Sequence, residues 1–88
     1  MSYPIHVLRH LVSKRNLTQL AYAIGVNRGT LQRFVNQKGY RLAYAVGHRI
    51  IEVIEADLDK RLKEAHPDDR KDIMDAHLAD IAEAAEQA

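Results

Sequence analysis

Apolar residues recur at intervals of three and four positions along most of the chain, and alternating runs of β-branched residues do not occur. Such intervals place apolar side chains on one face of an α-helix, whereas a half-buried strand needs a period of two. The sequence therefore predicts an all-α fold with four to five helices.

A polar segment that ends in asparagine separates the first two predicted helices. The first helix is expected over residues 4–14, with Ser2 able to cap it and a proline tolerated in its first turn. Asn16 predicts the start of a second helix over residues 17–24. Its side chain can accept a hydrogen bond from an amide of the first turn while the Gln19 side chain reaches back, which is a capping box.

Glycine and asparagine then predict a sharp turn into a third helix. Gly25 is expected to adopt the left-handed conformation that ends a helix, because it has no β-carbon. Val26 can tuck back into the core, and Asn27 can cap a helix over residues 28–36. Gly39 is expected to end that helix.

Two nearly identical hexapeptides occur, LAYAIG at residues 20–25 and LAYAVG at residues 42–47. Only the first is followed by turn residues, and the second continues into a long pattern without a cap. We therefore interpret the repeat as a coincidence of two helix faces built from small residues. Gly47 is expected inside a helix, where it costs up to ~1 kcal/mol relative to alanine.

The second half of the chain predicts two longer helices. The fourth is expected from residue 40 or 41 to about residue 65, and the side chains expected to face the domain are Leu42, Val46, Ile50, Val53 and Ile54. Pro67 ends it and opens a last helix, whose acidic first turn complements the helix dipole. One small domain cannot cover the apolar stripe of this segment, so the stripe needs a partner surface. The residues predicted to form a dimer interface are Leu58, Leu62, Ile73, Met74, His77, Leu78, Ile81 and Ala85.

The net charge of +1 conceals a strong asymmetry between the two halves. Residues 1–49 contain eight lysine and arginine residues and no carboxylate, whereas residues 50–88 contain twelve acidic and five basic residues. A segment without carboxylates indicates a negatively charged partner. At 88 residues the chain has room for one small domain, expected at residues 1–55, and an acidic helical segment at residues 56–88.

Several classes of function are disfavoured by what the sequence lacks. It has no cysteine, no long apolar run and no signal-peptide pattern, which indicates a cytoplasmic protein without a membrane segment. No nucleophile, base and orienting residue can be assembled, and no glycine-rich phosphate loop is present. His6 and His10 have the spacing of a metal pair but no third ligand in their half of the chain. We expect no enzyme activity, no cofactor and no metal.

The stretch NLTQLAYAIGVNRGTLQRFVNQKG resembles the helix-turn-helix of the lac repressor and lambda repressor/Cro-like families. Ala21 is small where the two helices would cross, and Gly25 supplies the turn. Leu17 stands where these families often have glutamine, so a phosphate contact there can fall to a neighbour. The resemblance implies a lambda-repressor-like domain with a C-terminal helical dimerisation segment. The positions that carry it are Asn16, Leu20, Ala21, Gly25, Val26, Leu31 and Phe34.

In such motifs the amino end of the second helix enters the major groove of DNA. The resemblance places four residues at base edges: Arg28, Gly29, Gln32 and Arg33. Arginine suits guanine and glutamine suits adenine, each good pair supplying ~1–3 kcal/mol of discrimination. Gly29 either lets the backbone approach a thymine methyl group or a phosphate, or is only tolerated near a helix start. The predicted phosphate contacts are Thr18, Gln19, Tyr22, Asn27, Thr30, Asn36, Lys38, Tyr40 and Arg41, and the two tyrosines can equally be packed residues.

The resemblance implies a transcriptional regulator of the repressor type found in phages and plasmids, binding a palindromic operator in double-stranded DNA as a homodimer. One alternative is an antitoxin-like module, whose acidic helices neutralise a basic partner protein and which binds DNA only for autoregulation. Another hypothesis is nonspecific coating of nucleic acid, which predicts no preference for a palindromic site.

Overall fold

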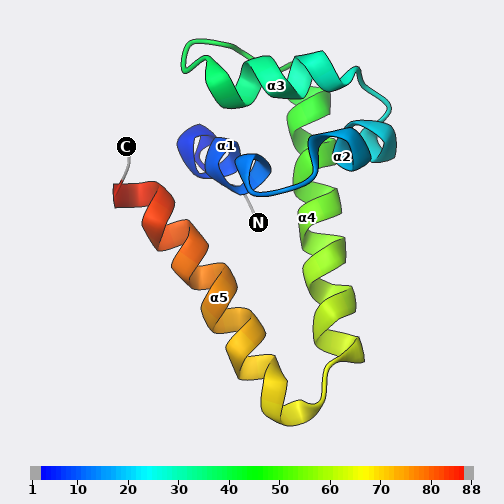
Figure 1. Cartoon of the computed structure of the whole chain (residues 1–88), viewed down its shortest axis with the longest axis vertical. Coiled ribbons are helices and arrows are strands. Elements are labelled where there is room, and N and C mark those ends of the chain that lie inside the picture. The colour runs from blue at the N-terminus through cyan, green and yellow to red at the C-terminus, as the bar shows by residue number, and fades with distance from the viewer. Residues whose placement is uncertain (1–2, 87–88) are drawn as a thin grey trace.

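The computed structural model describes residues 3–86, and over this range the chain forms five α-helices and no strand (Figure 1). The all-α prediction is confirmed. Ser2, which we expected to cap the first helix, lies outside the described residues. The helices are α1 (Ile5–Ser13), α2 (Leu17–Ile24), α3 (Arg28–Asn36), α4 (Tyr44–Glu64) and α5 (Pro67–Glu86).

The three short helices pack around one hydrophobic core together with the first half of α4. Leu31 and Phe34 of α3 are completely buried, as are Val12 of α1 and Ile50 of α4. Burial of each such side chain favours folding by about 1.5–3 kcal/mol relative to exposure. The core therefore holds α3 by one face and leaves its opposite face toward solvent.

Asparagine side chains cap α2 and α3, as predicted. The Asn16 side chain accepts a hydrogen bond from the Gln19 amide at 3.1 Å, and the Asn27 side chain accepts one from the Gly29 amide at 2.7 Å. No hydrogen bond from the Gln19 side chain back to Asn16 occurs in the described chain, so only one half of the capping box forms. Gly25 ends α2 with φ 75°, in the left-handed region, which confirms the predicted turn.

The prediction that Gly39 ends α3 was wrong. The backbone is already extended at Gln37, with φ −117° and ψ 106°, and Gly39 does not have a positive φ. Arg9 of α1 instead satisfies one carbonyl in the last turn of this helix and one beyond its end. Its Nε donates to the Phe34 carbonyl and its Nη2 to the Lys38 carbonyl, both at 2.9 Å. A side chain from another helix therefore takes the place of the expected glycine cap.

The predicted start of the fourth helix at residue 40 or 41 was also wrong, because α4 begins at Tyr44. Residues 37–43 form an irregular connector from which Tyr40 and Leu42 pack against the core. Burying these two side chains outweighs the helix propensity of the segment. Only the last four residues of the second hexapeptide are helical, so the two hexapeptides differ in conformation, and Gly47 lies inside a helix as predicted.

α4 and α5 diverge from their short connection, and α5 returns to contact α1 (Figure 1). Pro67 opens α5 as predicted, and the His66 side chain caps the new helix by accepting from the Asp68 amide at 3.3 Å. Ala84, near the end of α5, is buried in the same core as the first helices, and Ile81 packs against it. α3 lies at one end of the longest axis, which extends 39 Å, and the connection between α4 and α5 lies at the other (Figure 1).

We expect Gly25→Ala to lower the free energy of unfolding by about 1–2 kcal/mol, because a β-carbon disfavours the left-handed conformation. No heavy atom lies within 4 Å of that β-carbon position, so the cost comes from the backbone alone. Urea unfolding measures the change. Gly39→Ala is the matched control, since its φ is not positive and its β-carbon position is equally open. Equal losses in the two variants would contradict the argument.

Candidate nucleic-acid interface

α3 presents a polar face outward because its apolar face is held in the core. Arg28, Gln32 and Arg33 are exposed, whereas Leu31 and Phe34 on the other face have no exposed surface. Within the described chain neither Arg28 nor Arg33 forms an ion pair or a side-chain hydrogen bond. Three of the four predicted base-reading residues are therefore available to a ligand.

Gly29 has a local role that the sequence did not reveal. A β-carbon on Gly29 would lie 3.2 Å from Oδ1 of Asn27, which is tighter than an ordinary contact, and 3.8 Å from Nη2 of Arg33. The lack of a side chain therefore allows the Asn27 cap to approach the Gly29 amide closely, whereas the Arg33 guanidinium is at an ordinary contact distance. Glycine at this position therefore leaves room for the Asn27 cap.

Most of the predicted phosphate contacts lie at the surface. Thr30 is half-buried, and Tyr40 is packed against the core, which favours the packing alternative for that tyrosine. Tyr22 is 90% exposed, which excludes a packed role for it within this chain. The exposed members of the set are Thr18, Gln19, Tyr22, Asn27, Asn36, Lys38 and Arg41.

Half of the eight basic side chains in residues 1–49 are occupied within the chain. Arg9 donates to the Phe34 carbonyl in the last turn of α3 and to the Lys38 carbonyl on the connector. Arg49 donates to the Ile24 carbonyl at the end of α2, at 3.2 Å. Arg15 pairs with Asp57 of α4 at 3.2 Å, and Lys14 pairs with α5. The four that form no ion pair or side-chain hydrogen bond within residues 3–86 are Arg28, Arg33, Lys38 and Arg41.

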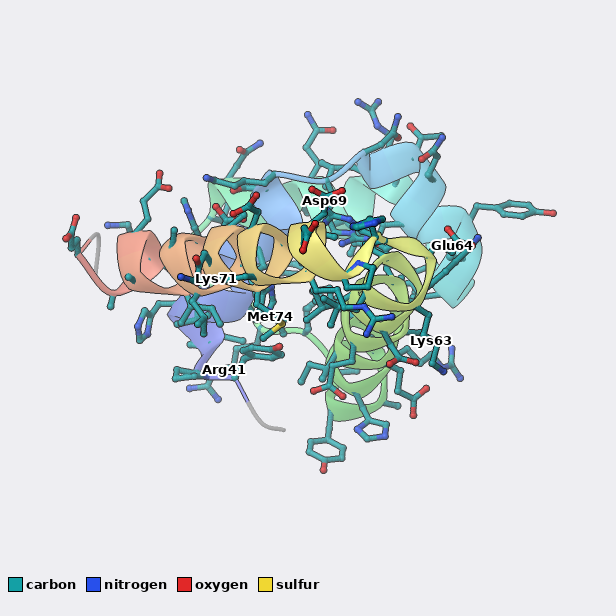
Figure 2. All side chains as sticks on the ribbon, turned by 90° about the horizontal axis from the view of Figure 1, so that it is seen from below. Arg41, Lys63, Glu64, Asp69, Lys71 and Met74 are labelled. Carbon is teal, nitrogen blue, oxygen red and sulfur yellow. The ribbon has the colours of Figure 1, made fainter. Side chains whose placement is uncertain are left out.

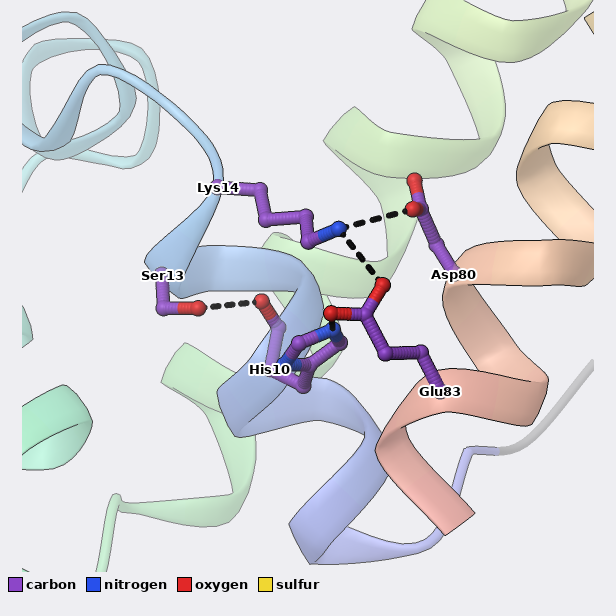
Figure 3. Close-up of polar contacts among 5 residues, drawn as sticks. All are labelled: His10, Ser13, Lys14, Asp80 and Glu83. Carbon is purple, nitrogen blue, oxygen red and sulfur yellow. Dashed lines mark hydrogen bonds and ion pairs between the residues drawn. The ribbon is translucent and has the colours of Figure 1, made fainter. Parts of the chain in front are cut away.

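Lys14 joins the carboxyl end of α1 to the last turns of α5 (Figure 3). Its Nζ lies 3.0 Å from Asp80 Oδ1 and 2.9 Å from Glu83 Oε2, and His10 Nε2 lies 3.7 Å from Glu83 Oε1. We call Lys14, Asp80 and Glu83 the α1–α5 bridge. The hydrogen bond with Glu83 raises the pKa of Lys14, and the same bond lowers the pKa of Glu83. Each charge therefore stabilises the other. Lys14 is one of the eight basic residues in residues 1–49, and its positive charge is neutralised inside the chain.

α5 makes a further polar contact with the segment before α1. The Tyr3 hydroxyl lies 3.3 Å from His77 Nε2, and the two rings meet edge to face. Burial raises the pKa of the Tyr3 hydroxyl, and the nearby Glu55 carboxylate adds to this effect. His77 and Ile81, two residues of the predicted dimer interface, are therefore used inside one chain.

The remaining residues of the predicted dimer interface are less covered. Leu78 is 55% exposed, Ala85 is exposed, and Leu58 and Ile73 are half-buried. Leu62 and Met74 line a shallow depression with Lys63 and Arg70. Asp69 and Met74 point to opposite sides of α5 (Figure 2).

Comparisons of the chain with protein-family models, with curated proteins and with solved structures found no match. No helix among residues 3–86 combines the length and the apolar character that crossing a membrane requires. In the same part of the chain, no three histidine or acidic side chains come together in a way that could hold a metal ion. A functional assignment therefore depends on the surface of α3 and its surroundings.

The α1–α5 bridge predicts a loss of stability in acid. The pKa of Glu83 is lower in the folded chain than its ordinary value of 4.5, so ionised Glu83 favours the folded chain above that pH. This contribution disappears as the pH falls through the folded-state pKa. We expect the stability difference between the wild type and Glu83→Gln to shrink toward zero as the pH falls from above 4.5 through the folded-state pKa of Glu83. Urea unfolding at a series of pH values measures it.

Glu86→Gln is the matched control for this experiment, because Glu86 is an exposed carboxylate on the same helix without an ion pair in the described chain. Its stability difference from the wild type should stay near zero at every pH. A Glu83→Gln difference that does not depend on pH would contradict the assignment.

Proposed function

We propose that the chain is a sequence-specific DNA-binding protein that reads DNA with α3 and regulates transcription as a homodimer. One observation carries this proposal. Residues 1–49, the segment without carboxylates, contain eight basic residues. The four that form no ion pair or side-chain hydrogen bond within residues 3–86 all lie on α3 or on the connector that follows it. The other four donate hydrogen bonds to backbone carbonyls or form ion pairs with carboxylates of the chain itself.

The arrangement of α2, the turn at Gly25 and α3 supports a helix-turn-helix as the DNA-reading unit. In that motif the amino end of the second helix enters the major groove and the first helix crosses the backbone. Arg28 and Arg33 would contact guanine and Gln32 would contact adenine. The core behind α3 and the cap from Asn27 hold the helix rigidly, which precise base reading requires.

The connector after α3 and the start of α2 would position the protein on the sugar-phosphate backbone. Lys38 and Arg41 lie on the connector, and Thr18 and Gln19 lie in the first turn of α2. Their ammonium, guanidinium, hydroxyl and amide groups suit phosphate oxygens. The acidic first turn of α5 lies at the far end of the long axis from α3 (Figure 1), so its charges would not oppose the phosphates at close range.

A homodimer follows from the amount of base contact that one copy can supply. Three exposed side chains on a short helix read few base pairs, and a two-fold pair doubles that number on a palindromic site with half-sites ~34 Å apart. Repression needs nothing beyond occupancy of such a site, so a repressor acting in the cytoplasm is the simplest form of the proposal.

Selection of bound sequences from a random DNA pool tests the proposal directly. We expect an enriched palindromic site. Arg33→Ala should then relax the preference at particular base pairs, with a loss of about 1–3 kcal/mol on the selected site, because it removes a base contact. Lys38→Ala, the matched control, should weaken binding to all sequences alike, because a phosphate carries no sequence information.

Equal losses on every sequence for both variants would contradict the division of roles. A wild type that binds without any preference would support nonspecific coating instead. A chain that binds DNA weakly but forms a tight complex with a basic protein through α5 would support the antitoxin-like alternative.

The proposal also predicts a steep dependence on salt. If a dimer neutralises about six phosphates, the logarithm of the association constant should fall with a slope of about −5 against the logarithm of the salt concentration. Affinity should therefore drop roughly a thousandfold between ~50 and ~200 mM salt. Fluorescence anisotropy with the selected duplex measures the slope, and Lys38→Ala should reduce its magnitude by about 1 for each lysine removed. A flat response would rule out phosphate-dominated binding.

A further inference from the structure

Two of the most exposed large apolar side chains border one groove between α1 and α4. Ile5 is 54% exposed and Tyr44 is 89% exposed. The groove has a volume of about 550 Å³, and Leu8, Leu42 and Ile51 supply apolar walls. Exposed apolar surface that surrounds a hollow of this size is typical of a site for a ligand or a partner.

Gly47 lines the same groove from the interior of α4. No heavy atom of the described chain lies within 4 Å of the position that a β-carbon on Gly47 would occupy. Packing inside the chain therefore does not require glycine here, although glycine weakens a helix interior. Its effect is to keep the groove open and to allow a group from outside to approach the backbone of α4.

Tyr44 is held as a projecting group beside this groove. Its ring stacks on His48, with the ring planes 11° apart and the centroids 6.3 Å apart, and His48 Nε2 lies 2.9 Å from Glu52 Oε1. One surface thus carries both a projecting aromatic ring and an open groove, which suits a two-fold interface because the two copies use the same patch.

The charges around the groove also favour a second copy. Glu52 and Glu55 border the groove, and Arg41 borders an adjoining depression that shares Ile5 and Leu42 with it. A second copy brings both signs of charge to this rim, so opposite charges can face each other across the contact. A partner with only one sign of charge would meet a like charge at one edge.

We propose that a second copy of this chain occupies the groove, with Tyr44 of each copy inserted above Gly47 of the other. The inference rests on the homodimer of the proposed function and adds a contact that the apolar stripe of α5 does not include. It lies next to the connector that carries Lys38 and Arg41.

Two variants test the groove and the tyrosine ring separately. Gly47→Leu fills the groove and keeps the tyrosine, whereas Tyr44→Ala removes the ring and keeps the groove. Each variant alone loses both contacts of the symmetric pair. An equimolar mixture regains one of them, because Tyr44 of the Gly47→Leu chain can enter the open groove of the Tyr44→Ala chain. Sedimentation velocity and native mass spectrometry, both without DNA, measure association and identify heterodimers by mass.

We expect each variant alone to associate at least about tenfold more weakly than the wild type, the scale of losing a buried aromatic contact. In the equimolar mixture the heterodimer should exceed twice the amount of either homodimer, which is the proportion that random pairing alone would give. Gly47→Ala is the matched control and should associate within a few-fold of the wild type, because a methyl group leaves most of the groove open. Circular dichroism should show that both test variants keep their helicity, since leucine favours a helix interior and Tyr44 is exposed.

A wild type that stays monomeric throughout the micromolar range, a Gly47→Leu variant that associates like the wild type, or a mixture without excess heterodimer would each overturn the inference. The readout does not involve DNA, so the two proposals can fail separately. A wild type that dimerises through this contact but shows no operator preference would support the contact and contradict the DNA target.

Discussion

The burial of Leu31 and Phe34 fixes the orientation of α3, and the outward direction of its polar residues depends on it. Arg9 adds to this constraint from α1. Its guanidinium carbon lies 5.1 Å from the centre of the Phe34 ring while its nitrogens hold the Phe34 and Lys38 carbonyls. One arginine thus joins the back of α3 to the connector that follows it. Arg28, Gln32 and Arg33 project from a helix whose position is set from the opposite side.

Ion pairs connect the two oppositely charged halves of the sequence in the folded chain. These pairs determine which basic side chains stay available to a partner. Lys14 and Arg15, at the corner between α1 and α2, pair with carboxylates of α5 and α4. These pairs are at least partly exposed, so each contributes modestly to stability. Their larger effect is on the charge distribution, because they leave the free positive charge of the first half on α3 and its connector.

The elements that local pattern controls could be predicted from the sequence. The bounds of α2 and α3 follow from Asn16, Gly25 and Asn27, whose side chains or backbone act within one turn. The residues that terminate α3 and the start of α4 could not be predicted, because they depend on Arg9 reaching across from α1 and on Tyr40 and Leu42 packing into the core. Contacts between residues far apart in the sequence override the local signal there.

The same distinction applies to the candidate site. The exposure of Arg28, Gln32 and Arg33 follows from the helical period, which puts them opposite the apolar stripe of α3. The roles of the other basic residues do not follow from any local pattern. Nothing near Arg9 or Arg49 in the sequence indicates that they bind backbone carbonyls. Lys14 and Glu83 lie far apart in the sequence, so their ion pair could not be predicted from a local pattern.

The exposed position of the α1–α5 bridge makes the attachment of α5 responsive to the surrounding electrolyte. At physiological ionic strength the Debye length is about 8 Å, and mobile ions compete with solvent-exposed pairs as they compete with any phosphate contact. A rise in salt therefore loosens the last helix from the first, and it would also weaken the proposed binding to DNA. The attachment of α5 and the proposed binding to DNA would then both depend on the salt concentration. A salt dependence measured for one of them would include a contribution from the other.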